Sequence, residues 1–225
     1  MTTAETALDT RSRLADPLEA ATYRKVTWRL APLFCLCFLA SYLDRANVGF
    51  AKLQMQGELN WSETVYGLGA GLFFISYILL EVPSNLVLQK VGARLWIARI
   101  MVTWGLVSGA MMFATTPASF YVLRFLLGAA EAGFYPGVMY YFTAWFPARR
   151  RSRVIAIFML GIPLASMVGA PMSGWIMTRF DGMGGLAGWQ WMFALEALPA
   201  ILLGLCVYAV LPSSIGAASW LTARQ

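Results

Sequence analysis

The chain has 225 residues, of which 59% are hydrophobic and only 12% are charged, and its formal net charge is +6. Soluble domains carry about 25% charged residues, so this composition argues against a soluble protein. The basic residues stand in short clusters between apolar runs, which argues against a nucleic-acid-binding surface. The complete absence of histidine excludes histidine-ligated metal sites and histidine proton relays.

The apolar sequence is divided into six runs, each about as long as a helix that crosses a bilayer. Strands are excluded because the runs are long and do not alternate. The predicted spans lie at about 28–48, 65–88, 95–113, 120–142, 154–177 and 189–211, behind a polar tail over residues 1–27. The sequence therefore predicts an all-α integral membrane protein with a six-helix bundle over residues 28–211.

The loop charges predict the orientation of this bundle. Of the 17 lysines and arginines, thirteen fall in the tail, the second-to-third loop, the fourth-to-fifth loop and the chain end. The opposite loops hold only Lys52 and Arg179, and Arg45 and Arg124 lie within spans. Because cytoplasmic loops are enriched in basic residues, we expect both termini in the cytoplasm and the bundle in the cell membrane.

Six ionisable side chains interrupt the predicted spans. Each costs roughly 2.5–3.5 kcal/mol near the centre of a bilayer, so we expect them to face the bundle interior and to pair there. They are Asp44, Arg45, Glu81, Arg124, Glu131 and Glu196.

Helical spacing places several of these side chains relative to one another. Arg124 and Glu131 are two turns apart on one face, about 10 Å from each other, and Gly128 between them is predicted to leave that space open. Asp44 and Arg45 are adjacent, so their side chains diverge. Tyr77, Glu81 and Asn85 form a polar stripe on the second span. A set of structural ion pairs is the alternative, and it is favoured for Glu81 and Glu196.

Small residues and prolines predict how the helices pack. The glycine pairs allow close helix approach, and the prolines within spans are expected to kink them. The pairs are Gly67/Gly71, Gly105/Gly109 and Gly133/Gly137, and the prolines are Pro83, Pro136, Pro163 and Pro171.

The first and fourth spans each carry an acid and an arginine. They would be equivalent elements if the chain consisted of two inverted three-helix repeats, the unit from which major facilitator transporters are built.

Several motifs together resemble the anion:cation symporter family of the major facilitator superfamily. The resemblance covers nearly the whole chain from residue 28, and residues 212–225 resemble the start of the family's cytoplasmic linker. The motifs are Y-L-D-R-A-N (42–47), Tyr77 with E-V-P-S-N (81–85), Arg124 with E-A-G-F-Y-P-G (131–137), W-F-P (145–147) and G-W-Q-W-M-F (188–193) with Glu196.

The resemblance implies a function and roles for residues. Members typically have twelve spans and import organic anions such as sugar acids, tartrate or aromatic carboxylates with protons, so this chain would be the N-terminal half, with a second six-helix half as its partner. Arg45 would bind the substrate carboxylate beside Tyr42 and Tyr77. Asp44 and Glu131 would carry protons, and Arg124 would be their charge partner. No cofactor beyond the coupled proton is expected.

The family's cytoplasmic gate is only partly matched. Glu81, Asn85, Lys90, Gly92 and Arg94 occupy its positions, but Gln89 replaces the usual acid, so a charge-based latch should be weaker. The next cytoplasmic loop is wholly basic over residues 149–151.

Two other classes of function are alternatives to a symporter. A channel, or a truncated membrane fragment that does not transport, could use the charges as structural ion pairs. An intramembrane enzyme is disfavoured because the sequence offers no convincing pair of nucleophile and base.

Overall fold

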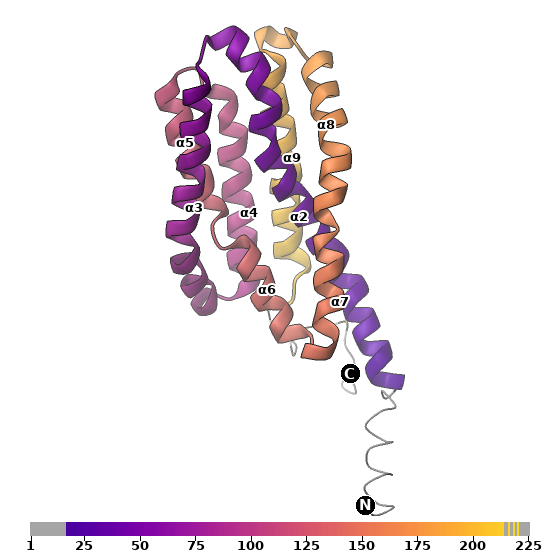
Figure 1. Cartoon of the computed structure of the whole chain (residues 1–225). Coiled ribbons are helices and arrows are strands. Elements are labelled where there is room, and N and C mark those ends of the chain that lie inside the picture. The colour runs from indigo at the N-terminus through magenta and orange to yellow at the C-terminus, as the bar shows by residue number, and fades with distance from the viewer. Residues whose placement is uncertain (1–16, 214–215, 217, 219, 221–225) are drawn as a thin grey trace, which may run out of the picture.

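The structure, a computed structural model, describes residues 17–213, 216, 218 and 220. This part of the chain is almost entirely helical and contains no strand, which confirms the predicted all-α class (Figure 1). In chain order the α-helices are α2 (Pro17–Leu59), α3 (Glu63–Val91), α4 (Ala93–Ala110), α5 (Pro117–Glu131), α6 (Phe134–Trp145), α7 (Ala148–Met159), α8 (Gly161–Arg179) and α9 (Gly188–Val210). Short 3-10 turns are η1 (Met111–Phe113) and η2 (Met183–Gly185).

The first helix is longer than the predicted span. Residues 17–27, which we assigned to the polar tail, form the first turns of α2 and continue without a break into the apolar run. At 43 residues, α2 is about 65 Å long, roughly twice the thickness of the hydrocarbon core. It therefore projects beyond the rest of the bundle at the end that carries both termini (Figure 1). Residues 1–16 of the predicted tail, and most of the predicted linker, lie outside the described residues.

Five helical segments of the described chain are long and apolar enough to cross a membrane. They contain the first, second, third, fifth and sixth predicted spans. The fourth predicted span, 120–142, corresponds to α5 and α6, which have 15 and 12 residues and meet at a break over residues 132–133. The sequence therefore predicted the apolar segment correctly but not its division into two helices.

This break depends on a glycine. Gly133 has φ +89°, a left-handed conformation that side chains with a Cβ rarely adopt. A Cβ at this position would also lie 2.4 Å from Ser84 Oγ of α3. Pro136 follows in the first turn of α6, where its missing N–H costs no helical hydrogen bond. Pro83 and Pro171, by contrast, lie inside the continuous helices α3 and α8.

The helix contacts follow an inverted repeat of three plus three spans. In such a repeat the first, second and third spans are equivalent to the fourth, fifth and sixth. The contact of α3 with α5 then corresponds to that of α8 with α2, and the contact of α4 with α5 corresponds to that of α9 with α2. The repeat exchanges α4 and α9, so their mutual contact maps onto itself. All of these contacts are present, and the first span and the fourth run in opposite directions (Figure 1).

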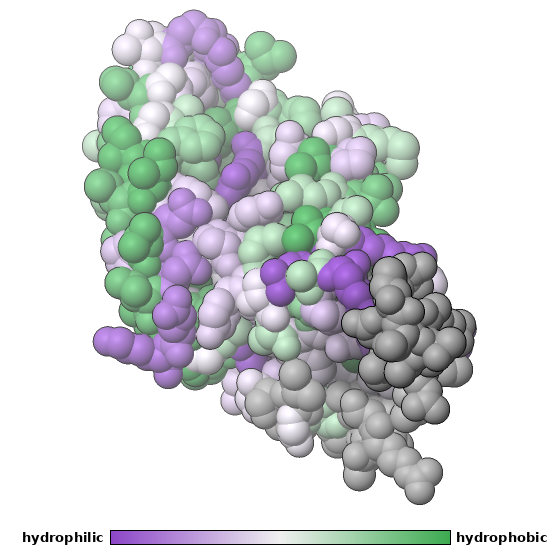
Figure 2. All heavy atoms as spheres, turned by 60° about the horizontal axis from the view of Figure 1, so that its bottom comes forward, coloured by the Kyte–Doolittle hydropathy of each residue, from purple (hydrophilic) through white to green (hydrophobic). Residues whose placement is uncertain are grey.

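The flanks of the bundle are hydrophobic and its end is hydrophilic. Figure 2 shows hydrophobic residues along the flank formed by α3, whereas hydrophilic residues gather on the end near the termini. Exposed apolar side chains of α3 include Phe74, Ile78 and Val82, which are 54%, 66% and 67% exposed. Because water would not favour such a surface, this flank is suited to lipid or to another apolar helix.

The glycines pack differently from the prediction in two places. Gly105 and Gly109 contact α9, and Gly137 contacts Leu88 of α3, as expected. No atom, however, lies within 4 Å of a Cβ built on Gly67 or Gly71. Gly128, which we expected to leave open space, instead lets α5 approach the backbone of α3 closely. A Cβ there would lie 2.2 Å from the Phe73 carbonyl oxygen.

Candidate functional site

The middle of α2 carries a run of polar side chains into the bundle. Ser41, Asp44 and Asn47 are 1%, 3% and 0% exposed, and Arg45 is partly exposed. Ser41 precedes Asp44 by three positions and Arg45 by four, so it lies beside both, whereas the adjacent Asp44 and Arg45 point toward different helices. From this segment, one contact reaches α5 and another reaches α4.

The contact with α5 is an ion pair with a buried acid. Glu131, the last residue of α5, is fully buried, and its Oε1 accepts hydrogen bonds from Ser41 Oγ at 2.5 Å and from Arg45 Nε at 3.0 Å. Its other oxygen, Oε2, has no partner among the described residues. Oε1 is therefore occupied by the ion pair and the serine, and Oε2 remains open to a proton or to another hydrogen-bond donor.

The contact with α4 is made by the second acid. Ser108 Oγ of α4 donates to Asp44 Oδ1, and Asp44 Oδ2 is buried without a described partner. We predicted that Asp44 or Glu131 would pair with Arg124. Both acids lie in the same region of the bundle, but each already has a donor from another side chain.

The predicted ion pair of Arg124 is not formed in the part of the chain that the structure describes. Arg124 Nε donates to the Gly69 carbonyl oxygen of α3 at 3.4 Å, and its guanidinium carbon lies 4.6 Å from the centre of the Phe73 ring. Nη1 of this buried arginine has no described partner. The reason for the difference is that Arg45, on α2, lies closer to Glu131 than Arg124 does on its own helix.

Arg45 is the most accessible cation of the site. Its side chain is 34% exposed, and its guanidinium carbon lies 5.0 Å from the centre of the Tyr77 ring and 5.8 Å from that of Phe73. Such aromatic faces stabilise a cation without neutralising it. Tyr77 therefore lies beside Arg45 as predicted. Tyr42 is 37% exposed and makes no described contact with Arg45, so the structure does not bring it into this group.

A second polar group lies where α8 and α9 meet. Ser173 Oγ donates to Glu196 Oε1 at 2.7 Å, and both residues are buried. Asn47 of α2 is buried in the same region. Glu196 thus joins two helices by a hydrogen bond rather than by an ion pair.

The predicted gate residues follow the end of α3 and the start of α4. Asn85 Nδ2 donates to the Glu81 carbonyl oxygen at 2.7 Å, and Gly92 has φ +95° at the tight connection. Lys90 is exposed. Arg94 Nε donates to the Tyr208 carbonyl oxygen of α9 at 2.7 Å. None of these side chains forms an ion pair with another described residue, so the group does not form a charged latch in this state.

Sequence reasoning missed the two serines that hold the acids. Ser41 could have been found, because it precedes Asp44 and Arg45 by three and four positions on the same helix. Ser108 gave no such signal, because its partner is on another helix and serine is common in apolar spans.

Comparison with known proteins is consistent with this arrangement. The family model described as Major Facilitator Superfamily matches residues 34–224. The "Putative metabolite transport protein NicT" of Pseudomonas putida is 62% identical over 203 residues, which are 90% of this chain and 46% of that protein. A "Putative tartrate transporter" of Agrobacterium vitis is 53% identical over 212 residues, 94% of this chain and 47% of that protein. The chain thus spans about half the length of these relatives.

A solved structure shares the fold. A bacterial homologue of the human lysosomal transporter Spinster, in an inward-facing and occupied conformation, superposes with a TM-score of 0.73. The superposition covers 84% of this chain and 45% of that one, at 18% sequence identity. It supports the arrangement of the helices alone.

Proposed function

Because the chain belongs to the major facilitator superfamily, as a match to the N-terminal half of its longer members, we propose that it is half of a proton-coupled symporter for an organic anion. The substrate would be a carboxylate such as a sugar acid, tartrate or an aromatic acid. It would be taken up by alternating access between this half and a second six-helix half. Transport as the general activity is supported by the relatives, which are named as metabolite and tartrate transporters.

The direct bond between Arg45 and Glu131 is the observation that carries this proposal. A substrate carboxylate needs a cation, and guanidinium groups bind carboxylates well, often through two hydrogen bonds. Arg45 is the partly exposed cation of the site, and its present partner is the carboxylate of Glu131. Substrate and Glu131 would therefore compete for the same guanidinium.

This competition gives a physical reason for coupling to protons. When a proton binds the free Oε2 of Glu131, the carboxyl group becomes neutral and loses most of its attraction for Arg45. The guanidinium is then available to a substrate anion. When the proton leaves, the Glu131 carboxylate attracts Arg45 again and the substrate is released. In this scheme, proton and anion move together because each favours the binding of the other.

Asp44 would be the second proton carrier. Its buried carboxyl group is held by Ser108 on one oxygen and is free on the other. The buried positive charge of Arg124 would interact with both acids. A change in the charge of one acid is therefore expected to alter the proton affinity of the other. Arg124 would thus act at a distance rather than as a direct partner.

Uptake into proteoliposomes tests the role of Glu131. We expect Glu131→Gln in the protein that carries both halves to abolish accumulation driven by a pH gradient but to retain substrate binding or exchange. Glutamine keeps the shape and the hydrogen-bonding capacity but cannot carry the proton. Uphill uptake by this variant would refute the assignment. Uptake that is equally fast with and without a pH gradient in the wild type would favour a channel.

Substrate binding to purified protein tests the role of Arg45. We expect Arg45→Ala to abolish binding of the anion, whereas Lys52→Ala, which removes a cation of similar exposure outside the site, should leave it unchanged. Unchanged affinity in Arg45→Ala would count against this assignment.

The same proposal includes an orientation. The basic residues of the tail, of the α3–α4 connection and of α7 would lie in the cytoplasm, so both ends of this half would be cytoplasmic. Labelling of single cysteines by a membrane-impermeant reagent in intact cells would test this orientation.

A further inference from the structure

A pocket lies at the end of the bundle near the termini, away from Arg45 and Glu131. It has a volume of about 660 Å³ and lies between the first turns of α2 and α7, which pack against each other. Ligand sites commonly have volumes of about 300–1,000 Å³. We propose that this basic pocket binds an anionic glycerophospholipid, with the phosphate held by arginines and the first part of an acyl chain held by the apolar wall.

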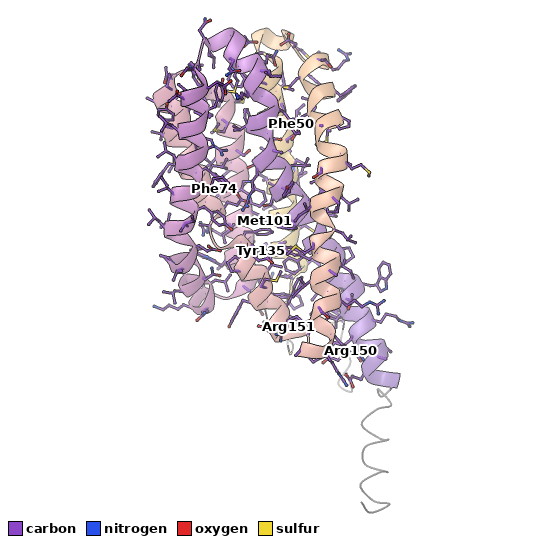
Figure 3. The ribbon with its side chains drawn as sticks, in the orientation of Figure 1. Phe50, Phe74, Met101, Tyr135, Arg150 and Arg151 are labelled. Atoms are coloured by element: carbon purple, nitrogen blue, oxygen red, sulfur yellow. The ribbon has the colours of Figure 1, made fainter. Side chains whose placement is uncertain are left out.

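The charge of the pocket indicates an anion. Arg24 of α2 and Arg149, Arg150 and Arg153 of α7 line it, and no carboxylate among the described residues does. The nearby Glu19 pairs with Arg149 and lies 3.7 Å from Arg150 Nε. Figure 3 shows Arg150 at the lower end of α7, beside α2.

Two of these arginines are available to a ligand. Arg24 and Arg153 are exposed and form no ion pair with any described residue. Arginine and phosphate form charge-assisted hydrogen bonds, often in pairs. The pocket therefore has the donors to hold a phosphate group without breaking the existing pairs with Glu19.

An apolar part of the pocket lining distinguishes a lipid from a free anion. Farther along the same two helices, Ala31, Pro32, Val154 and Ile157 also line the pocket, and this apolar wall offers a phosphate ion nothing to bind. Pro32 and Ile157, which are exposed and half-buried, would cover the hydrocarbon next to a headgroup. A ligand that uses both the arginines and the apolar wall must carry a phosphate and an apolar chain.

The level of the pocket along the membrane normal fits the same ligand. Trp28, which also lines it, is 76% exposed and stands where the polar first turns of α2 give way to the apolar span. Tryptophan favours this level of a membrane, where the headgroups lie. A polar protein segment would explain the arginines but not an exposed tryptophan beside an apolar wall.

Native mass spectrometry can test the proposal. The protein would be extracted in mild detergent, stripped of lipid and titrated with phosphatidylglycerol, with phosphatidylcholine as the zwitterionic control. We expect the wild type to bind phosphatidylglycerol preferentially. Arg24→Gln/Arg153→Gln should bind it about 25-fold more weakly, since each basic side chain near an anionic headgroup contributes a factor of about five.

Matched controls make each outcome decisive. Arg179→Gln removes another exposed arginine, the last residue of α8, which does not line the pocket, and should change lipid binding little. Equal weakening by Arg179→Gln, or unchanged binding by the double variant, would overturn the proposal. Displacement of the lipid by millimolar inorganic phosphate would assign the pocket to a free anion. Absence of lipid from the wild type, with Arg153 cross-linked to an acidic residue of the full-length protein, would assign it to a protein segment.

Discussion

Removing the side chain of Arg45 would leave Glu131 buried with its charge unpaired. The two atoms Arg45 Nε and Glu131 Oε1 are 3.0 Å apart, and the side chains are 34% and 0% exposed. Breaking a buried pair costs about 3–5 kcal/mol, and partial exposure of the arginine places this pair near the lower end of that range. For a chain of this size we therefore expect Arg45→Ala to lower the melting temperature by roughly 6–12 °C.

A double variant separates this charge effect from lost packing. Arg45→Ala/Glu131→Gln removes both charges, so it should recover most of the lost stability. Tryptophan fluorescence during heating in detergent measures each melting temperature.

An exposed ion pair supplies the control for this experiment. Lys52 pairs with Glu63 and is 33% exposed, almost the same as Arg45, but its partner is 72% exposed. Because water solvates that carboxylate in either state, Lys52→Ala should change the melting temperature little. Equal shifts for Arg45→Ala and Lys52→Ala, or a double variant as unstable as Arg45→Ala, would refute the reasoning.

Two glycines allow further tests by the same melting assay. Gly128→Ala should destabilise the protein by about 1–3 kcal/mol, because its Cβ would lie 2.2 Å from the Phe73 carbonyl oxygen and force α5 away from α3, whereas Gly67→Ala, with nothing within 4 Å, should be nearly neutral. Gly133→Ala should lower the free energy of unfolding by a similar amount, because alanine would be strained in the left-handed backbone conformation and its Cβ would clash with Ser84. A melting temperature equal to that of the wild type would show that the break between α5 and α6 relaxes without strain.

Much of the fold could be predicted from the sequence because a bilayer imposes simple rules. Apolar runs of the required length give the spans, and their number and order follow directly. The division of the fourth span could not be predicted with the same ease. It depends on one positive φ at Gly133, and a glycine in an apolar run serves close packing just as often, as Gly128 does here.

The members of the candidate site could also be predicted, but not their pairing. Each ionisable side chain in a span is costly enough to mark an interior position, so Asp44, Arg45, Arg124 and Glu131 were all identified. Spacing along one helix suggested that Arg124 and Glu131 act together. The structure pairs Glu131 with Arg45 instead, because the distance between side chains on neighbouring helices depends on the rotation and height of each helix, which sequence spacing does not contain.

The place of Glu131 at the very end of α5 has a mechanical consequence. A residue in the middle of a helix can move only with the whole helix, whereas Glu131 is followed at once by two residues with non-helical backbone. Rotation about the bonds of residues 132 and 133 would swing α6 while α5 stays packed on α3 and α4 and the carboxylate at its end stays bound to Arg45. The break and the ion pair are neighbours in the chain, so a change in the ion pair with Arg45 and a change in the direction of α6 would be transmitted through only two residues.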